Sequence, residues 1–302
     1  MFKYIKHKDI DKPRWNESLE KCINAHVYAY TWYLDTVSPN WDALVWGDYE
    51  MLFPLTHKTK YGIRYLCQPL FIRYFDIYAT DKLPEHTHYL LLLRTLKVHF
   101  KFIEINILKE LYQDQIPDYT LRKLQAQHYN YSTPAPVISH SLKQNLNRAK
   151  KAGLKNFEFI DTIAFSYFTQ RALANKIPDL KIKDFGLLKH LMEVSIQHGH
   201  GITIGIKNEN GIVLSGEFMV SGFGTQTLVI GFTHEEGKKN GAMSYLRYEY
   251  IQAIKNQEKY FDFGGSNLPG VAQFNLTFGS TNYHYSGIKH NSLPAWVRIF
   301  KK

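Results

Sequence analysis

The sequence predicts an α/β protein of two tandem domains, each with a mixed, mostly antiparallel sheet flanked by helices. The order of the patterns carries this prediction, because helices, then a series of strands, then alternating strand and helix occur once in each half of the chain. The length of 302 residues agrees with two domains of about 150 residues each. A hydrophobic content of 44%, with 21 Tyr and 19 Phe, is far from that of a disordered chain. We therefore interpret the halves as a duplicated α/β unit.

The first half begins with a predicted strand at residues 2–6, followed by helical patterns over residues 15–22 and 27–37. Residues alternate on either side of Gly47 and Asp48, which predicts a β-hairpin. The stretch "YGIRYLCQPLF" then continues the sheet.

A helix, a strand and a stiff linker are predicted at the end of the first half. Pro84 opens the helix, because proline is tolerated in a first turn, and leucines at helical spacing extend it. The stretch "KFIEINIL" returns as a strand. Pro134 and Pro136 stiffen an extended segment. We therefore place an N-terminal domain at residues 1–132 and a C-terminal domain at residues 133–302.

The second half is predicted to contain helices at about residues 139–151, 161–174, 184–198 and 241–255. Strands are expected on both sides of an Asn-Gly turn and again at "TQTLVIGF". The strand "KYFDFGG" leads into a last helix with Pro269 in its first turn, a cap at Ser266 or Asn267, and Gly279 in a left-handed conformation at its end.

Charge predicts an anionic partner. The net charge is +10 and the isoelectric point is near 9.3. Candidates are a nucleic acid, a phosphorylated cofactor, a diphosphate lipid carrier or the inner membrane surface, and the alternative is a solvated positive surface without a ligand.

Several function classes are excluded by the pattern of apolar and metal-binding residues. The first residues contain no hydrophobic run, and the longest aliphatic run, at residues 89–93, is too short to span a bilayer. Cys22 and Cys67 form no CxxC motif. The histidine pairs at 86–88 and 198–200 lack a third ligand at sensible spacing, so no metal site is predicted. We expect a cytoplasmic protein without a transmembrane segment, for which peripheral membrane contact stays open.

Three stretches resemble one known family. They are "SHSLKQNLNRAKKAGLKNFEFI" at 139–160, "KKNGAMSYLRYEYIQAIKNQEKYFDFGGSN" at 238–267 and "VAQFNLTFGS" at 271–280. They resemble the second half of the FemAB-like acyltransferases, a tandem branch of the GNAT superfamily of acyl-CoA N-acyltransferases. In the first half, "FPL" and "CQPLF" are similar to the N-terminal sheet of that group. The resemblance implies two GNAT-like domains with a cleft between them, and transfer of an acyl or aminoacyl group to an amine.

Asp262 ends the buried strand and has two interpretations. A carboxylate in that position needs hydrogen-bond partners. In the structural interpretation it accepts N–H groups from the turn of Gly264, Gly265 and Ser266 and holds the next helix in place. In the catalytic interpretation it is the general base for an attacking amine.

Two further residues are catalytic candidates. Glu217 shares a strand face with Ser215 and Met219, so it lines the cleft as a base or is a solvated sheet carboxylate. Tyr283 supplies a proton to a leaving group or is a packing or rim residue.

The basic helix is the predicted substrate-binding element. Residues 139–157 contain no acid, whereas a solvated helix usually interleaves Glu with Lys. The absence of acids favours an anion site over a plain surface. The residues expected to contact the phosphates of a lipid-linked sugar, coenzyme A or RNA are Lys143, Arg148, Lys150 and Lys151.

The resemblance also implies a donor site. GNAT enzymes bind pyrophosphate at a helix N-terminus through Q/R-x-x-G-x-G/A, and "EGKKNG" at 236–241 is the corresponding stretch. Glu236 stands where Arg or Gln is expected and Lys239 replaces the first Gly, and these departures favour aminoacyl-tRNA over acyl-CoA as the donor. Asn275 stands where aminoacyl-transferring relatives carry Lys, and this departure argues against aminoacyl-tRNA. The predicted donor-binding residues, including backbone N–H groups for an oxyanion, are Ile230, Gly231, Lys238, Lys239, Asn240 and Gly241.

The functional prediction is an N-acyltransferase that uses acyl-CoA or aminoacyl-tRNA and an amine acceptor. No tightly bound cofactor is expected, and acyl-CoA would be a co-substrate. The alternative is a non-catalytic protein of the same fold that binds RNA or an anionic lipid-linked headgroup through its basic face.

Overall fold

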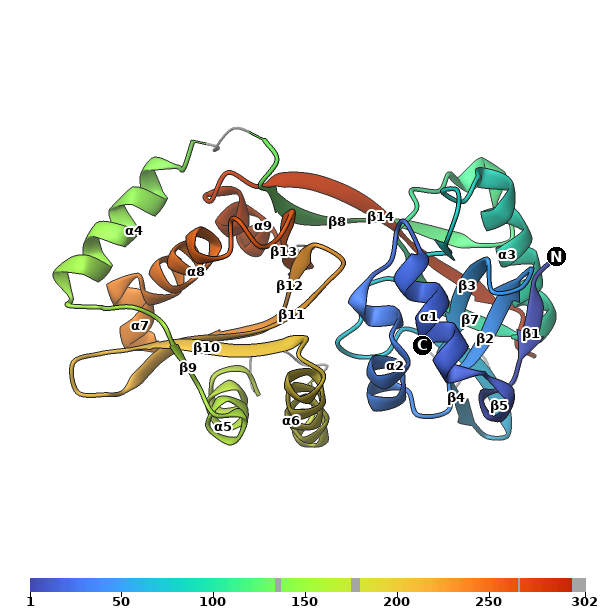
Figure 1. Cartoon of the computed structure of the whole chain (residues 1–302), viewed down its shortest axis with the longest axis horizontal. Coiled ribbons are helices and arrows are strands. Elements are labelled where there is room, and N and C mark those ends of the chain that lie inside the picture. The colour runs from blue at the N-terminus through green and yellow to red at the C-terminus, as the bar shows by residue number, and fades with distance from the viewer. Residues whose placement is uncertain (134–136, 175–179, 266, 295–302) are drawn as a thin grey trace. The chain divides into compact units, whose positions relative to one another are not determined.

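The structure, a computed structural model, describes residues 1–133, 137–174, 180–265 and 267–294 (Figure 1). The chain forms two compact units. Unit 1 contains Met1–Leu124 and the segment from His284 onward, and unit 2 contains Gln125–Tyr283. The chain therefore passes into unit 2 at Leu124, before the predicted boundary at residue 132, and returns to unit 1 at its end. Pro134 and Pro136, on which that boundary rested, lie outside the described residues.

Unit 1 contains three α-helices and most of its strands in the first part of the chain. Its helices are α1 (Lys12–Lys21), α2 (Thr31–Val37) and α3 (His86–His99), with 3-10 turns η1 (His7–Asp9), η2 (Val27–Ala29) and η3 (Gln113–Gln115). Its strands are β1 (Lys3–Ile5), β2 (Asp42–Trp46), β3 (Met51–Leu55), β4 (His57–Lys60), β5 (Ile63–Cys67), β6 (Tyr78–Ala79), β7 (Phe102–Ile107) and most of β14 (Thr281–Asn291). The hairpin predicted around Gly47 and Asp48 is the antiparallel pair β2–β3.

Unit 2 has helices on both faces of one sheet; α5 and α6 cover one face and α8 the other (Figure 1). Its helices are α4 (His140–Lys151), α5 (Thr162–Leu173), α6 (Ile182–Gln197), α7 (Glu235–Asn240), α8 (Ala242–Ala253) and α9 (Pro269–Leu276). Its strands are β8 (Thr120–Asn130), β9 (Glu158–Phe159), β10 (Gly201–Lys207), β11 (Val213–Gly222), β12 (Thr225–Thr233) and β13 (Tyr260–Gly265).

The two units share one strand order. In unit 2 the order is β9-β10-β11-β12-β13-β8, and β12 and β13 are parallel. In unit 1, β1-β2-β3-β6 form a separate sheet. β3 leads through Thr56 into β4, and β4-β5-β7-β14 continue the order in the larger sheet, with β5 and β7 parallel. At the last position the two units exchange a strand. β14, from the end of the chain, pairs with β7 of unit 1, and β8, which follows β7 in the sequence, pairs with β13 of unit 2. The predicted pair of similar α/β units is confirmed as a fold, and the exchange explains why a single boundary does not divide them.

Most predicted elements of unit 2 are confirmed within one or two residues, but three elements were not foreseen and one helix cap differs. The stretch around residues 236–241, to which no element was assigned, forms most of α7. Residues 120–130 and 281–291, not assigned to strands, form β8 and β14. The cap of α9 is Leu268, because the Asn267 Oδ1 accepts the Gln125 N–H at 3.1 Å instead. Ser266, the other predicted cap, lies outside the described residues.

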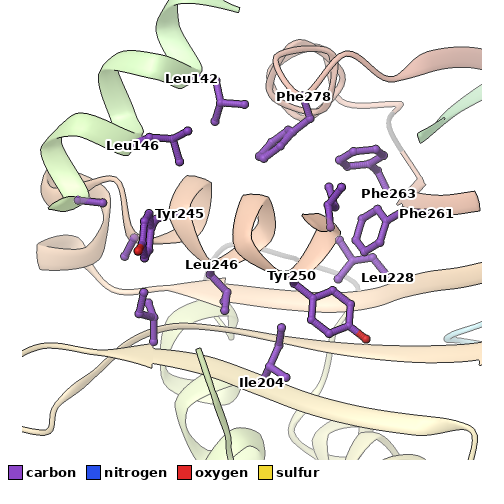
Figure 2. Packing of buried hydrophobic residues seen from close by; sticks show 14 of the residues in the cluster. Leu142, Leu146, Ile204, Leu228, Tyr245, Leu246, Tyr250, Phe261, Phe263 and Phe278 are labelled. Atoms are coloured by element: carbon purple, nitrogen blue, oxygen red, sulfur yellow. The ribbon is translucent and has the colours of Figure 1, made fainter. Parts of the chain in front are cut away.

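The hydrophobic core on the α8 face of unit 2 contains side chains from α4, α8 and β13 and from the turn that follows α9 (Figure 2). Leu142 and Leu146 of α4 are buried, as the apolar stripe predicted, and Phe261 and Phe263 of β13 lie in the same cluster. Burying each such side chain stabilises the unit by about 1.5–3 kcal/mol. The apolar stripe thus fixes α4 beside α8 and leaves its basic residues on the other side.

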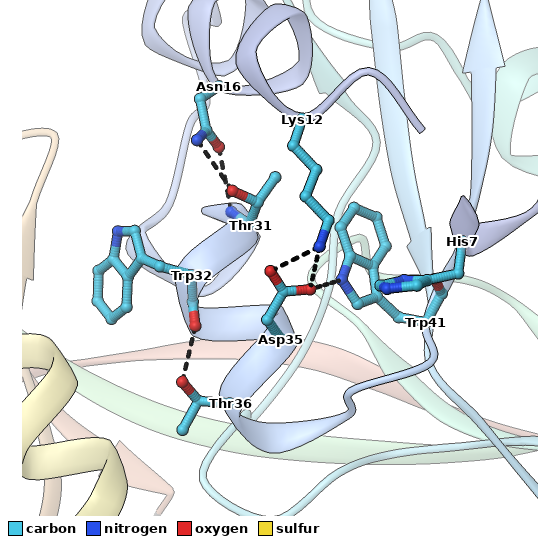
Figure 3. Close-up of polar contacts among 8 residues, drawn as sticks. All are labelled: His7, Lys12, Asn16, Thr31, Trp32, Asp35, Thr36 and Trp41. Atoms are coloured by element: carbon cyan, nitrogen blue, oxygen red, sulfur yellow. Dashed lines mark hydrogen bonds and ion pairs between the residues drawn. The ribbon is translucent and has the colours of Figure 1, made fainter. Parts of the chain in front are cut away.

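Polar contacts connect α1 and α2 in unit 1 (Figure 3). Lys12 Nζ donates to both Asp35 carboxylate oxygens at 2.9 and 3.0 Å, and the Trp41 indole N–H donates to the same carboxylate at 3.0 Å. Asn16 and Thr31 exchange two hydrogen bonds at 2.9 and 3.1 Å. The end of α2 and the loop after it are therefore held in a fixed position.

Among the described residues, no helix is both long and apolar enough to cross a membrane.

Candidate functional site

The parallel strands β12 and β13 separate after a short paired stretch. Thr225–Thr227 pair with Tyr260–Asp262, and within the described residues no pairing continues beyond Asp262, although β12 runs on to Thr233. Along the other edge of β12, Met219 pairs with Leu228 and Phe218 with Ile230. Val229 is therefore an extra residue, a β-bulge that bends the strand away. The result is a gap between two strands whose backbone groups are not used by the sheet.

A pocket of about 270 Å³ lies at the end of β12, between α4, α7 and α8. Its lining includes Thr233 of β12 and both positive side chains that point to this corner, Arg148 of α4 and Lys238 of α7. Gly241, at the N-terminus of α8, has a φ of +71°. A Cβ there would lie 2.6 Å from the Asn145 carbonyl oxygen, so only glycine permits α4 to approach this closely.

Hydrogen bonds order the wall of this pocket. Asn145 Nδ2 donates to Ser244 Oγ at 3.0 Å, and the Arg148 guanidinium donates to Asn145 Oδ1. Lys238 Nζ lies 2.5 Å from a Glu235 carboxylate oxygen. The N-terminal end of a twelve-residue helix and one arginine without a carboxylate partner in the described chain thus meet in a single concave site, which is a favourable environment for an anion.

This pocket unites residues that the sequence placed in two separate sites. Arg148 was predicted for the substrate, and Lys238 and Gly241 for the donor. Lys143, Lys150 and Lys151 are exposed on α4 and do not line the pocket. Lys239 and Asn240, in α7, also lie outside its lining, and Glu236 accepts a hydrogen bond from Asn208 at 3.1 Å.

Ile230 and Gly231 follow the bulge on β12. Gly231 is the register partner of Glu217, and a Cβ at Gly231 would lie 3.3 Å from the Glu217 Cγ and 3.4 Å from the Met243 Cε. The glycine therefore leaves room for the Glu217 side chain under α8. Ile230 pairs with Phe218 beyond the bulge.

A buried polar network fills the α8 face next to this gap. Arg247 donates to Glu217 Oε1 from Nε, at 2.8 Å, and from Nη2, and its Nη1 donates to Asn275 Oδ1 at 2.9 Å. Asn275 Nδ2 donates to Gln127 Oε1 at 3.1 Å. Glu217 has no exposed surface, and its Oε2 has no hydrogen-bond partner among the described residues.

The guanidinium of Arg247 also lies 5.1 Å from the centre of the Phe274 ring, a cation–π contact that desolvation strengthens. Sequence reasoning missed Arg247 and Gln127. The only signal was an arginine inside the otherwise buried stretch of α8, where an unpaired charge would be costly. Asn275, noted as a departure from the family pattern, is a fully buried member of this network.

Asp262 lies at the point where β12 and β13 separate, on the opposite face of the sheet from Glu217. Its Oδ1 accepts the Gly264 N–H at 2.9 Å, and its Oδ2 accepts the Tyr283 hydroxyl at 2.8 Å. Its neighbour Thr227, on β12, is buried, and the Thr227 hydroxyl has no partner among the described residues. The structure therefore brings together two of the three predicted catalytic residues and separates Glu217 from them.

His128 completes this cluster from β8. It is the register partner of Asp262, and its ring stacks on Tyr283 with centroids 5.3 Å apart. Burial lowers the pKa of His128, and the nearby Asp262 carboxylate opposes that shift. The imidazole beside the Asp262–Tyr283 pair is thus biased towards its neutral form, which can accept a proton.

Neither a protein-family model nor a curated protein sequence matches the chain. Solved structures do. FemX is 12% identical with a TM-score of 0.66, over 92% of this chain and 96% of its own. The chain has a FemX-like tandem GNAT fold. The L-PGS structure from Bacillus licheniformis is 13% identical with a TM-score of 0.60, over 96% of this chain and 95% of its own. A tandem GNAT protein from the clavulanic acid biosynthesis pathway is 9% identical with a TM-score of 0.57, over 98% and 100%. The predicted FemAB-like GNAT resemblance is confirmed at the level of the fold.

Proposed function

We propose that this protein is a GNAT-type N-acyltransferase that moves an acyl or aminoacyl group from a phosphate-bearing donor to an amine. The observation that carries the proposal is the gap between β12 and β13, which opens beside the pocket of Arg148, Lys238 and the α8 N-terminus. A donor with its phosphates in the pocket could extend its reactive chain along the free edge of β12. Acyl-CoA and aminoacyl-tRNA both have this chemistry.

The chemistry follows from the groups around the gap. The amine attacks the thioester or ester carbonyl, and backbone N–H groups freed at the Val229 bulge stabilise the oxyanion. Asp262 takes a proton from the attacking nitrogen, and the Tyr283 hydroxyl gives its proton to the departing thiolate or alkoxide and regains one from Asp262. Much of the rate enhancement would come from holding donor and amine together.

Glu217 has a positioning role in this proposal. Because its Oε1 is bound by Arg247 and it lies under α8, it supports the strand at the bulge rather than touching the amine. The lipid-linked acceptor and the cytoplasmic location expected from the sequence stay predictions.

A second candidate is a non-catalytic protein that binds RNA or an anionic headgroup. The exposed lysines of α4 favour it, because Lys143, Lys150 and Lys151 form no ion pair within the described parts of the chain. Such a surface would hold a polyanion without a reaction.

The test combines donor binding with turnover. Calorimetric titration with coenzyme A, and filter binding with a mixture of aminoacyl-tRNAs, should show which donor binds the full-length protein. Arg148→Gln combined with Lys238→Gln should weaken that binding by about tenfold, since two charged contacts to phosphate are lost. Lys189→Gln combined with Lys207→Gln, two other unit 2 lysines, is the matched control.

Turnover is measured as amide product by mass spectrometry, with the bound donor and a panel of primary amines. Asp262→Asn should abolish product formation while leaving donor affinity unchanged. Donor binding without product in any acceptor panel would favour the non-catalytic candidate. Absence of binding by both donors would contradict the transferase and the binding of RNA.

A further inference from the structure

A groove of about 560 Å³ lies in unit 1 between the edge strand β4 and the loop that joins α2 to β2. The loop wall contributes the polar residues Ser38 and Asn40, and the strand wall contributes His57, Lys58, Thr59 and Lys60, with Tyr65 of β5 beside them. Among the described residues that line it, none is acidic. The volume is that of a site for one small molecule. This β4 groove belongs to unit 1 alone and has no part in the donor site of unit 2.

His57 is oriented from behind by a carboxylate. Its Nε2 lies 3.0 Å from Asp42 Oδ2, and Asp42 also accepts the His7 N–H at 2.7 Å, the Arg64 Nη1 at 3.0 Å and the Tyr4 hydroxyl. Burial opposes ionisation of Asp42, but the hydrogen bonds from His57, Tyr4 and His7 outweigh it and lower its pKa to about 2. Asp42 is therefore ionised near neutral pH and acts only as an acceptor, so His57 Nε2 carries a proton.

That tautomer leaves Nδ1 of His57 for the groove. The side chain is only 10% exposed, and within the described residues Nδ1 has no hydrogen-bond partner. A carboxylate behind an imidazole fixes the ring orientation and makes the opposite nitrogen a better base. Nδ1 accepts a hydrogen bond from a protonated ligand oxygen, or takes up that proton and donates it back.

The remaining polar groups around the groove are donors. Lys58 and Lys60 are exposed, and they form no ion pair in the described chain. Ser38 and Asn40 make no side-chain hydrogen bond among the described residues, and their loop is fixed, because the Trp41 N–H donates to the Ser38 carbonyl at 2.9 Å and its indole to Asp35 (Figure 3). A fixed loop with free donors opposite two cations loses little entropy on binding an anion.

We propose that the β4 groove is a second ligand site, which binds the phosphate group of a small molecule. His57, Lys58 and Lys60 line the groove from β4, and Ser38 and Asn40 line it from the loop. That number of donors suits an anion with three or four oxygens better than a carboxylate with two, and the two lysines exclude a metal ion. The phosphate is either free inorganic phosphate or part of an organic ester.

The experiment is calorimetric titration of the full-length protein with inorganic phosphate, pyrophosphate and AMP. All variants carry Arg148→Gln and Lys238→Gln, so that the unit 2 pocket is weakened equally in every comparison. Lys58→Gln combined with Lys60→Gln should weaken binding by about tenfold, and His57→Gln by a similar factor. Stronger binding of AMP identifies an ester as the ligand, and stronger binding of phosphate identifies the free ion.

The matched control replaces Lys21 and Lys82 by Gln, which removes the same charge from unit 1 outside the groove. It should bind as the unmodified background does. Lys58 and Lys60 lie on the surface, so their substitution should not disturb the fold. The result for this pair therefore tests the groove even if His57→Gln disturbs Asp42. No binding of any probe, or equal weakening by the groove pair and the control pair, would overturn the proposal.

Discussion

The two units have the same strand order but differ at their parallel strand pair. In unit 2, β12 and β13 separate after Thr227 and leave a gap. In unit 1 the chain itself fills the corresponding place: the Gln68 side chain accepts the Asn106 N–H at 2.9 Å. The Phe75 N–H donates to the Asn106 carbonyl at 2.9 Å, so the segment after β5 pairs with β7. One fold thus keeps a gap in one copy and closes it in the other, which is why we propose the donor site in unit 2.

Each unit also contains a buried carboxylate whose contribution to stability can be measured. In unit 2, Glu217 is paired with Arg247. In unit 1, the buried Asp76 accepts the Tyr89 hydroxyl at 2.6 Å and the Asn24 amide at 3.1 Å but forms no ion pair within the described residues. None of the five tryptophans lies within residues 125–283, and the four in the described part of the chain, Trp15, Trp32, Trp41 and Trp46, belong to unit 1. Tryptophan fluorescence therefore reports on unit 1, whereas circular dichroism reports on both units. The two optical signals can therefore separate the predictions below.

The largest effect is expected from breaking the paired charge in unit 2. Arg247→Met should lower the free energy of unfolding of unit 2 by about 3–5 kcal/mol, because Glu217 is left buried without a cation. In urea, the circular dichroism transition should move to lower concentration ahead of the tryptophan transition. Arg148→Met, at an exposed position, should leave both unchanged. A shared shift of both signals would contradict independent stability of the units.

The unpaired carboxyl in unit 1 should respond to pH in the opposite direction from most acids. Burial raises the pKa of Asp76 to about 6, from 3.8. Between those values the folded form keeps a proton that the unfolded form has released, so the stabilising contribution of Asp76 is fully present below about pH 4 and is lost as pH rises to 6. The loss should be roughly 2–3 kcal/mol. Asp76→Asn should flatten this dependence of the tryptophan-monitored urea midpoint, and an unaltered slope would show that Asp76 is not its origin.

The sequence predicted the helices and the strands that alternate clearly, because their apolar spacing is local. It did not predict β8, whose inward side chains include the polar Gln127 and whose pairing partner β13 lies far along the chain. The glycine turn of Asp262 was foreseen, since a carboxylate before Gly264 has a nearby N–H. The pocket was not, because Arg148 and Lys238 meet only when α4 packs on α8, and a long-range contact leaves no mark on residue spacing.

Two glycines with the same backbone conformation test whether the pocket of unit 2 is built by close helix packing. Gly241 and Gly211 have φ of +71° and +75°, so alanine is strained at both. Only at Gly241 would the new Cβ meet another atom, the Asn145 carbonyl oxygen at 2.6 Å. Gly241→Ala should therefore cost about 1–2 kcal/mol more than Gly211→Ala, in the circular dichroism transition alone. It should also weaken coenzyme A binding, whereas equal costs and unchanged binding would show that α4 moves aside freely.

Substitutions at the exposed lysines of α4 are expected to have the smallest effect on stability and to change binding alone. Lys143, Lys150 and Lys151 form no ion pair among the described residues, so replacing all three by Gln should leave both unfolding midpoints unchanged. Binding of a tRNA mixture should weaken, and the slope of log K against log salt should become shallower by roughly 2 to 3, because about three phosphate contacts are lost. The control is a triple Gln variant at Lys3, Lys6 and Lys8 of unit 1, which removes the same charge. If the two triple variants weaken binding equally, the effect comes from the net charge of +10 and not from α4.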